Sequence, residues 1–195
     1  SNNVSVIDTA SDQIIKTYPN MPGTHGVALT PDQRFCYATN RTANTVSVID
    51  LVQEKLLRTV AVTDPVGVVA SLDGKWMFVC SYEGLSVTRI NTSTYEVKHI
   101  PLGAKTRNGA ASPDGKSIYI CHPNSVDMSV LDVETGVKRS IRSIGGIWGI
   151  AFSQQGNVAY AVAETKIAVI DVTKESVTRY INNIGGWGIA VTRTG

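Results

Sequence analysis

A small group of aromatic, basic and polar residues has the chemistry to bind an anion or a flat ring. Arginine holds anions through charged hydrogen bonds, tryptophan stacks on rings and sugars, and histidine gains or loses a proton near neutral pH. These residues stand beside glycines or at the ends of apolar runs, where loops begin. The candidates are His25, Arg41, Tyr82, Arg107, Asn108, His122, Trp148 and Trp187.

A repeat in the sequence indicates where these residues lie in the fold. Residues 4–8 read Val-Ser-Val-Ile-Asp, residues 46–50 read the same, and related words return at 87–91, 128–132 and 167–171, a spacing of 39 to 42 residues. A second short motif begins with a glycine and recurs with the same period as the first. Its glycines are Gly26, Gly67, Gly109, Gly149 and Gly188.

Each repeat unit contains four short runs of β-branched and aromatic residues, which are typical of strands. Four-stranded units with this period predict the antiparallel blades of an all-β propeller. We expect one domain over residues 1–195, with complete blades at 26–61, 67–100, 109–141 and 149–181. An incomplete blade takes its two outer strands from residues 1–19 and its inner strand from residues 188–192.

In such blades the loop that enters the inner strand and the loop between the two middle strands lie on one face. The candidate residues therefore gather around the mouth of the central channel, and a concave mouth of this composition is the default ligand site. In the alternative, Trp148 and Trp187 fill the channel as core, the arginines are solvated, and the histidines bond loop backbone.

The words Tyr-Ala-Thr-Asn at 37–40 and Ser-Pro-Asp-Gly-Lys at 112–116 resemble the YVTN family of β-propeller repeats. That family is similar to surface-layer propellers and to the propellers of cytochrome d1 and quinohaemoprotein amine dehydrogenase. The resemblance covers essentially the whole chain and implies a propeller of seven blades. It says little about function, because the shared words lie in blade cores and turns.

Five blades of about 41 residues need about ten residues more than this chain has, the length of one strand with its turns. We expect the chain to be part of a larger propeller. Two alternatives are a five-bladed ring that takes its missing strand from a second chain, and a ring that closes imperfectly and dimerises.

The acidic residues recur blade after blade, so we assign them to turns and not to catalysis. One series is Asp8, Asp50, Asp132 and Asp171, and the other is Asp32, Asp73 and Asp114. Neighbouring sheets lie about 10 Å apart, which is too far for a disulfide between Cys80 and Cys121. We therefore expect buried free thiols, and the spacing of cysteines and histidines predicts no metal site.

Composition excludes several classes of protein. Eighteen basic and 16 acidic residues leave a net charge of +2, too balanced for a nucleic-acid surface. No apolar run reaches the about 18 residues of a membrane span. We predict a periplasmic or extracellular location, while three free thiols also fit the cytoplasm.

Three functions fit these residues. The first is a binding or scaffold propeller without a catalytic set or cofactor, whose top face meets a protein, a surface polymer or a small ligand. The second is a lactonase-like hydrolase or lyase for a small anionic substrate, with His25 or His122 as base and Arg107 stabilising charge. The third, implied by the resemblance to cytochrome d1 and amine dehydrogenase, is an oxidoreductase-associated propeller with His25 or His122 as axial haem ligand.

Overall fold

The computed structural model describes residues 2–142 and 145–192, and all its regular elements are β-strands. They form four antiparallel sheets of four strands and one sheet of two strands. Each four-stranded sheet is built from strands consecutive in the chain, so each is one blade. The predicted fold class is confirmed. In this part of the chain no helix has the length and apolar content to cross a membrane.

The blades are numbered in chain order, and the strands of each run from the channel outward. The N-terminal pair consists of β1 (Val4–Asp8) and β2 (Gln13–Tyr18). Blade 1 consists of β3 (Thr24–Leu29), β4 (Phe35–Asn40), β5 (Thr45–Asp50) and β6 (Lys55–Ala61). Blade 2 consists of β7 (Pro65–Ala70), β8 (Trp76–Ser81), β9 (Ser86–Asn91) and β10 (Val97–Pro101). Blade 3 consists of β11 (Asn108–Ala111), β12 (Ser117–Cys121), β13 (Asp127–Asp132) and β14 (Lys138–Arg142). Blade 4 consists of β15 (Gly149–Phe152), β16 (Val158–Val162), β17 (Lys166–Asp171) and β18 (Ser176–Asn182).

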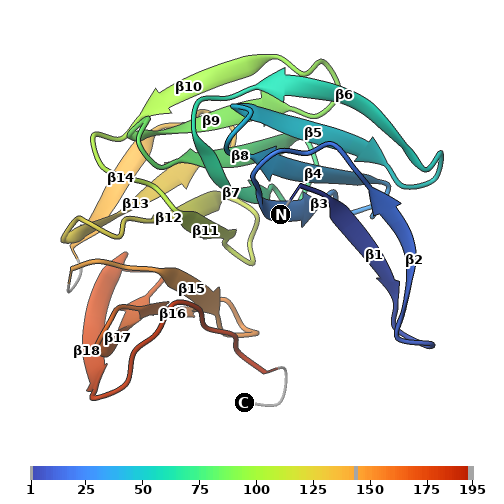
Figure 1. Cartoon of the computed structure of the whole chain (residues 1–195). Coiled ribbons are helices and arrows are strands. Elements are labelled where there is room, and N and C mark those ends of the chain that lie inside the picture. Colours follow the sequence, from blue (N-terminus) through green and yellow to red (C-terminus); the bar gives the residue numbers. More distant parts are fainter. Residues whose placement is uncertain (1, 143–144, 193–195) are drawn as a thin grey trace.

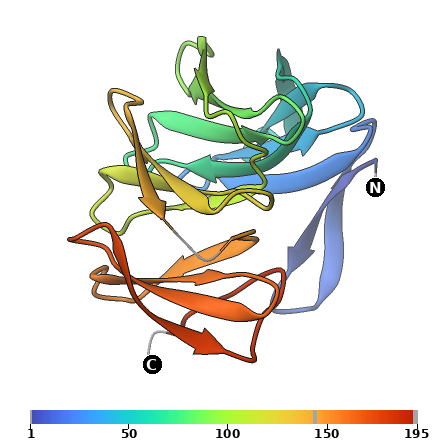
Figure 2. The same ribbon diagram turned by 90° about the vertical axis from the view of Figure 1, so that its left-hand side faces the viewer.

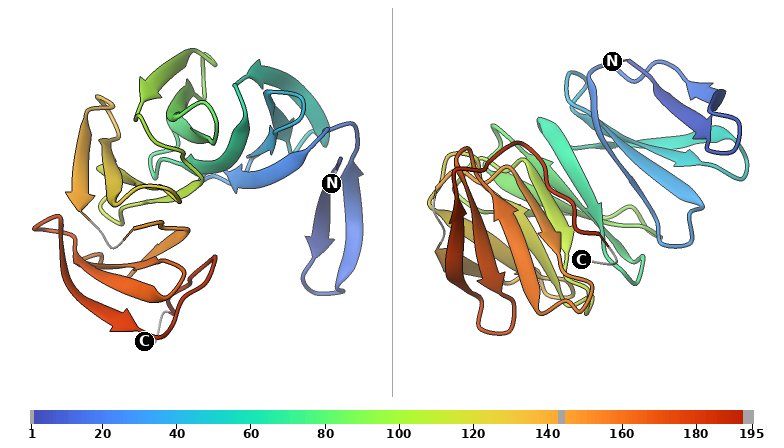
Figure 3. Two further views of the ribbon diagram at one scale, coloured as in Figure 1. Left: turned by 60° about the vertical axis from the view of Figure 1, so that its left-hand side comes forward. Right: turned by 90° about the horizontal axis from the view of Figure 1, so that it is seen from below.

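The blades stand side by side in an open arc (Figure 1). The inner strands β3, β7, β11 and β15 contact one another in that order and line its concave side. The N-terminal pair forms one end of the arc and blade 4 forms the other, with a wide opening between them (Figure 3). The chain therefore does not close into a five-bladed ring.

The two pieces expected to share one incomplete blade lie at opposite ends of the arc (Figures 1 and 3). The expected inner strand at 188–192 forms no strand. It belongs to a tail, residues 185–192, that follows β18 and lies along blade 4, which faces the viewer in Figure 2. The tail forms no ladder of hydrogen bonds with a described strand. The two strands expected to share its blade, β1 and β2, pair with each other at the other end of the arc (Figure 1).

The hydrophobic core is divided into layers, one between each two successive sheets. Between blades 1 and 2, for example, Tyr37 and Val48 from one sheet meet Met77 and Val79 from the other, all of them fully buried. Strand residues alternate between the two faces, so each four-stranded sheet supplies one side of two layers. The apolar alternation that predicted strands therefore also holds the blades together.

The inner strands approach one another most closely at glycines. A Cβ atom on Gly26 would lie 2.6 Å from the carbonyl oxygen of Val66 in the next blade. A Cβ atom on Gly67 would overlap the carbonyl oxygen of Arg107, one blade further on. Thr39 strengthens the first of these junctions, because its hydroxyl donates to the Val66 carbonyl at 2.7 Å and accepts from the Gly26 amide at 2.8 Å. Gly26 and Gly67 are thus required for the contacts between blades 1, 2 and 3, whereas a Cβ atom on Gly109 would meet the Tyr119 carbonyl of its own blade.

The recurring acidic residues serve turns, as predicted. Asp50 accepts hydrogen bonds from the backbone amides of residues 52 and 53, both at 2.9 Å, and Asn91 does the same for residues 93 and 94. In the other series the Ser112 hydroxyl donates to Asp114 at 2.6 Å. These bonds favour the charged carboxylate, so the pKa of Asp50 and that of Asp114 lie below their ordinary value.

The expected buried free thiols are also found. Cys36, Cys80 and Cys121 are all unpaired and buried. Burial raises the pKa of Cys36 to about 11 and that of Cys80 to about 12, so both stay protonated at neutral pH.

Replacement of Gly67 by alanine tests the close approach of the inner strands. The Arg107 carbonyl is backbone and cannot move aside, so we expect Gly67→Ala to lower the free energy of unfolding by about 2 kcal/mol. Gly188→Ala is the matched control, because Gly188 holds the same repeat position with no atom within 4 Å. Urea unfolding monitored by circular dichroism measures both. Equal midpoints for the two variants would contradict this account of the glycine.

Acid titration tests the turn carboxylates. Hydrogen bonds from the Thr173 hydroxyl and the Lys174 amide lower the pKa of Asp171 from 3.8 to about 2. The folded pKa is the lower one, so Asp171 stabilises the fold above about pH 4, and this contribution is lost as the pH falls toward 2. We expect Asp171→Asn to lower the urea midpoint at pH 6, with a smaller difference at pH 2. A difference that does not depend on pH would argue against a role for the charge.

Candidate functional site

The predicted residues lie on the face where loops enter the inner strands, but they divide into separate groups. Arg107 and the two tryptophans form the first group, with His25 near the arginine. Arg41 and Tyr82 form a second group with neighbouring acidic and basic residues. His122 is buried away from both. Asn108 is exposed at the start of β11, and its side-chain oxygen accepts a hydrogen bond from the adjacent Gly109 amide at 2.9 Å.

Arg107 lies against two indole rings contributed by the next parts of the chain. Its guanidinium carbon is 5.0 Å from the ring centre of Trp148 and 5.6 Å from that of Trp187. The two indoles contact each other at 4.5 Å with their planes tilted by 45°. Trp148 is half-buried and Trp187 is 70% exposed, so Trp187 does not belong to a core that fills the channel.

Backbone contacts position this group. The Arg107 amide donates to the Cys121 carbonyl at 3.2 Å, and the Arg107 carbonyl lies against Gly67 of the preceding blade. The Trp148 amide donates to the Val162 carbonyl at 2.9 Å. Gly186 donates to the carbonyl of residue 163 at 3.1 Å, which brings the tail and Trp187 back to blade 4. A Cβ atom on Gly146 or Gly185 would overlap a backbone carbonyl of blade 3 or blade 4, so these two glycines let the chain turn against blade backbone before each tryptophan.

Arg107 keeps its positive charge uncompensated. Among residues 2–142 and 145–192 no carboxylate forms a salt bridge with it, and its guanidinium lies against the two indoles. A guanidinium on an aromatic face retains its five N–H donors for another partner. The arrangement can therefore bind an anion beside an exposed ring.

His25 is an exposed residue of β3. Partial burial of its ring lowers its pKa below the ordinary value, and the positive charges of Arg107 and Arg41 lower it further. The imidazole is therefore neutral at pH 7, with a lone pair that can bind a metal or accept a proton.

Arg41 already has a carboxylate partner. Its Nε donates to Asp64 Oδ1 at 2.6 Å, and its guanidinium carbon lies 5.4 Å from the centre of the Tyr82 ring. Lys105 contacts the same ring at 4.6 Å and pairs with Glu83 at 2.6 Å. This second group is balanced in charge, unlike the first. Lys105 was missed in the sequence although it lies two residues before Arg107.

His122 has the role of a buried structural residue. Its Nδ1 bonds the carbonyl of Lys105 at 3.0 Å, its Nε2 bonds the hydroxyl of Ser129 at 2.8 Å, and its exposed fraction is 2%. Asn40 holds the same position in blade 1 and bonds Ser47 in the same way, at 2.8 Å. His122 therefore offers neither ring nitrogen to a ligand, which the repeat position of Asn40 could have indicated.

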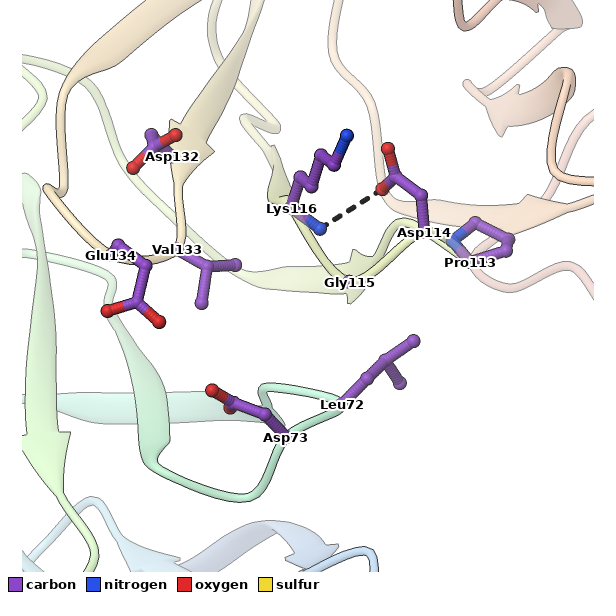
Figure 4. Close-up of a pocket in the computed structure, with 9 residues that line it drawn as sticks. All are labelled: Leu72, Asp73, Pro113, Asp114, Gly115, Lys116, Asp132, Val133 and Glu134. Atoms are coloured by element: carbon purple, nitrogen blue, oxygen red, sulfur yellow. Dashed lines mark hydrogen bonds between the residues drawn. The ribbon is translucent and has the colours of Figure 1, made fainter.

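The opposite face carries a cavity of about 470 Å³ between blades 2 and 3 (Figure 4). Two of the carboxylates that line it have partners nearby. Asp114 accepts a hydrogen bond from the Lys116 amide at 3.0 Å, and Glu134 forms a salt bridge with Lys75 at 3.3 Å. Within the part of the chain that the structure describes, no three histidine, cysteine or acidic side chains come together as a metal site. The lining of this cavity therefore consists of turn residues that the repeat supplies.

Comparison with known proteins identifies relatives of this fold. The sequence matches the family described as "Cytochrome D1 heme domain" over residues 1–181. No curated protein matches the chain by sequence.

Among solved structures, hydrazine synthase of Kuenenia stuttgartiensis is 25% identical with a TM-score of 0.79 over 85% of this chain. "Dihydro-heme d1 dehydrogenase NirN in complex with DHE" is 17% identical with a TM-score of 0.81 over 95% of it. The β-propeller domain of Myceliophteria thermophila Cps50 (Swd1) is 12% identical with a TM-score of 0.74 over 89% of it, which shows likeness of fold.

The chain is shorter than each of these proteins. It covers 50% of the hydrazine synthase chain, 42% of the NirN chain and 60% of the Cps50 chain. The open arc is thus similar to part of a larger propeller. The family match extends over more than nine-tenths of the sequence and agrees with the predicted resemblance to cytochrome d1 propellers. The chain belongs to the cytochrome d1 haem domain family.

Proposed function

We propose that the chain is a ligand-binding propeller whose channel mouth takes a planar aromatic molecule that carries carboxylates. The observation that carries this proposal is the unpaired Arg107 guanidinium on the indoles of Trp148 and Trp187. The arginine supplies charged hydrogen bonds to a carboxylate, and the exposed face of Trp187 supplies a surface for stacking. The contribution of the propeller is binding and orientation, and not a nucleophile with its base.

A tetrapyrrole such as haem d1 has this chemistry, and the name of the family supports it. One of the similar structures is the dihydro-haem d1 dehydrogenase NirN in complex with DHE. The residues of the mouth fit such a group. Arg107 would hold a carboxylate, Trp187 would stack on the ring, and His25 would bind the iron. When bound, a haem would supply a redox-active iron.

His25 is the candidate ligand of the iron because the rings of the other two histidines already make hydrogen bonds within the propeller. His122 is bonded at both ring nitrogens, and His99 lies on the outer strand β10 with its Nδ1 3.0 Å from the Thr88 hydroxyl. Because its pKa is lowered, His25 has a free lone pair at neutral pH. The same neutral imidazole is what the hydrolase alternative would need as its base. That alternative now depends on His25 alone.

Titration with iron protoporphyrin IX tests the proposal. Quenching of tryptophan fluorescence and the visible absorption band report binding by the wild-type chain. We expect Arg107→Gln to weaken binding about tenfold, the size of one charged hydrogen bond. Arg41→Gln should have less effect because Asp64 already neutralises Arg41, and Lys98→Gln on the outer rim should have none.

The dimethyl ester of the porphyrin is the matched ligand control. Without free carboxylates it should bind the wild type and Arg107→Gln equally. Equal affinity of the two proteins for the diacid itself would contradict the role assigned to Arg107. Absence of binding by the wild type would count against the proposed ligand class.

The pKa of His25 gives a second test, independent of any ligand. Arg107 lowers this pKa by charge repulsion. Its removal in Arg107→Gln should raise the pKa of His25 toward 6.5, since the protonated imidazole would lose a repulsive neighbour. NMR titration of the His25 ring protons measures the shift, with Lys98→Gln as control. An unchanged pKa would mean that Arg107 and His25 do not share a site.

A further inference from the structure

One dipeptide at the channel mouth has the chemistry to react with itself. Asn108 is the only asparagine of the sequence that is followed by a glycine. The backbone nitrogen of the next residue can attack the carboxamide of an asparagine, and a glycine leaves that nitrogen unshielded because it has no side chain. At the other inner strands the residue before the recurring glycine is His25, Val66 or Trp148, none of which carries a carboxamide.

The structure brings the two reacting groups together. The Gly109 amide donates to Asn108 Oδ1 at 2.9 Å, so the nitrogen lies beside the carboxamide carbon that it would attack. Asn108 is exposed, and water therefore has access to the product of the attack. It is also the first residue of β11, and residues 102–107 before it lie outside any strand, which leaves its backbone room to turn.

The two residues that flank Asn108 favour the reaction. A Cβ atom on Gly109 would lie 2.5 Å from the Tyr119 carbonyl oxygen, so the fold requires a glycine at this position. Arg107, on the other side, forms no salt bridge with a carboxylate among residues 2–142 and 145–192, and its guanidinium lies against the two indoles. Its positive charge stabilises the anion that forms when the amide nitrogen loses its proton.

The reaction balances with water as the co-reactant. Hydroxide removes the proton of the Gly109 amide, and the nitrogen forms a bond to the side-chain carbon of Asn108. The bond between that carbon and the carboxamide nitrogen breaks, and ammonia leaves with a proton taken from water. The cyclic imide that joins the two residues is then opened by water at either carbonyl, which gives aspartate or isoaspartate.

We propose that Asn108 is a site of spontaneous deamidation and that its product weakens anion binding at the channel mouth. Either product carries a carboxylate next to Arg107, and this charge competes with an anionic ligand for the guanidinium. Isoaspartate also lengthens the backbone. The Cα atom of Asn108 would lie 3.1 Å from a Cβ atom on Gly67, so a longer backbone disturbs the junction of blades 2 and 3. The effect on binding rests on the proposed function of Arg107.

Prolonged incubation of the purified, folded protein tests the deamidation. We expect the peptide that contains Asn108 to gain about 1 Da and to become a substrate of isoaspartyl methyltransferase. The gain should be faster at pH 8 than at pH 6, because the attack needs the deprotonated nitrogen.

Asn44 is the internal control for this incubation. It is also exposed, but Thr45 follows it, and its Oδ1 accepts a hydrogen bond from the amide of the distant Asp64 at 2.7 Å. Peptide mapping should therefore find Asn44 unchanged while Asn108 converts. Conversion of Asn108 no faster than that of Asn44 would overturn the proposal.

Two variants test the effect on binding. Asn108→Asp carries the charge of the product from the start, and we expect it to bind iron protoporphyrin IX about threefold more weakly than fresh wild type, the size of one exposed pair of charges. Asn108→Gln keeps the carboxamide but closes the larger ring much more slowly. It should bind like fresh wild type and keep its affinity during incubation. The dimethyl ester of the porphyrin should bind Asn108→Asp and fresh wild type equally.

The outcomes separate this proposal from the proposed function. Incubated wild type that converts at Asn108 and still binds the porphyrin as tightly as Asn108→Gln would overturn the effect on binding. Absence of binding by fresh wild type would contradict the proposed function, and the mass of the peptide would still decide whether Asn108 deamidates.

Discussion

The close approach of backbone to backbone at the inner strands of blades 1, 2 and 3 is the contact on which the packing of these blades and the geometry of the channel mouth depend. A carbonyl of one blade occupies the space that a side chain would fill on the glycine of the blade before it, as Arg107 does at Gly67. Such contact leaves little freedom in how two blades meet. The core layers farther out then fill with alternating strand residues, and their burial provides most of the stability.

The same contact determines the geometry of the mouth. Arg107 places its carbonyl against blade 2 and directs its side chain toward indoles from two later segments of the chain. The site is therefore assembled across junctions and not within one blade. A change in blade packing at Gly67 would move the guanidinium as well as destabilise the arc. Blade packing and the position of the Arg107 guanidinium are thus coupled through a single residue.

Residues of one chemical type have different roles according to their neighbours. His122 and Asn40 share a position and the same bond to a strand hydroxyl, so a residue that could be reactive becomes part of the core. Arg41 and Arg107 are both arginines of the top face, yet Asp64 neutralises only the first. Chemical type alone did not distinguish these cases. Local charge and burial did, because they determine which donors and lone pairs stay free.

The sequence by itself determined the class of fold, the number of complete blades and the structural role of the aspartates. Those features depend on local periodicity and on turn chemistry, both of which short segments contain. Only the tertiary structure decided that the arc stays open, that His122 is buried, and that Trp187 meets Trp148. It also decided that no carboxylate of the described residues pairs with Arg107. These outcomes depend on distances between residues far apart in the chain, and a sequence pattern does not record such distances.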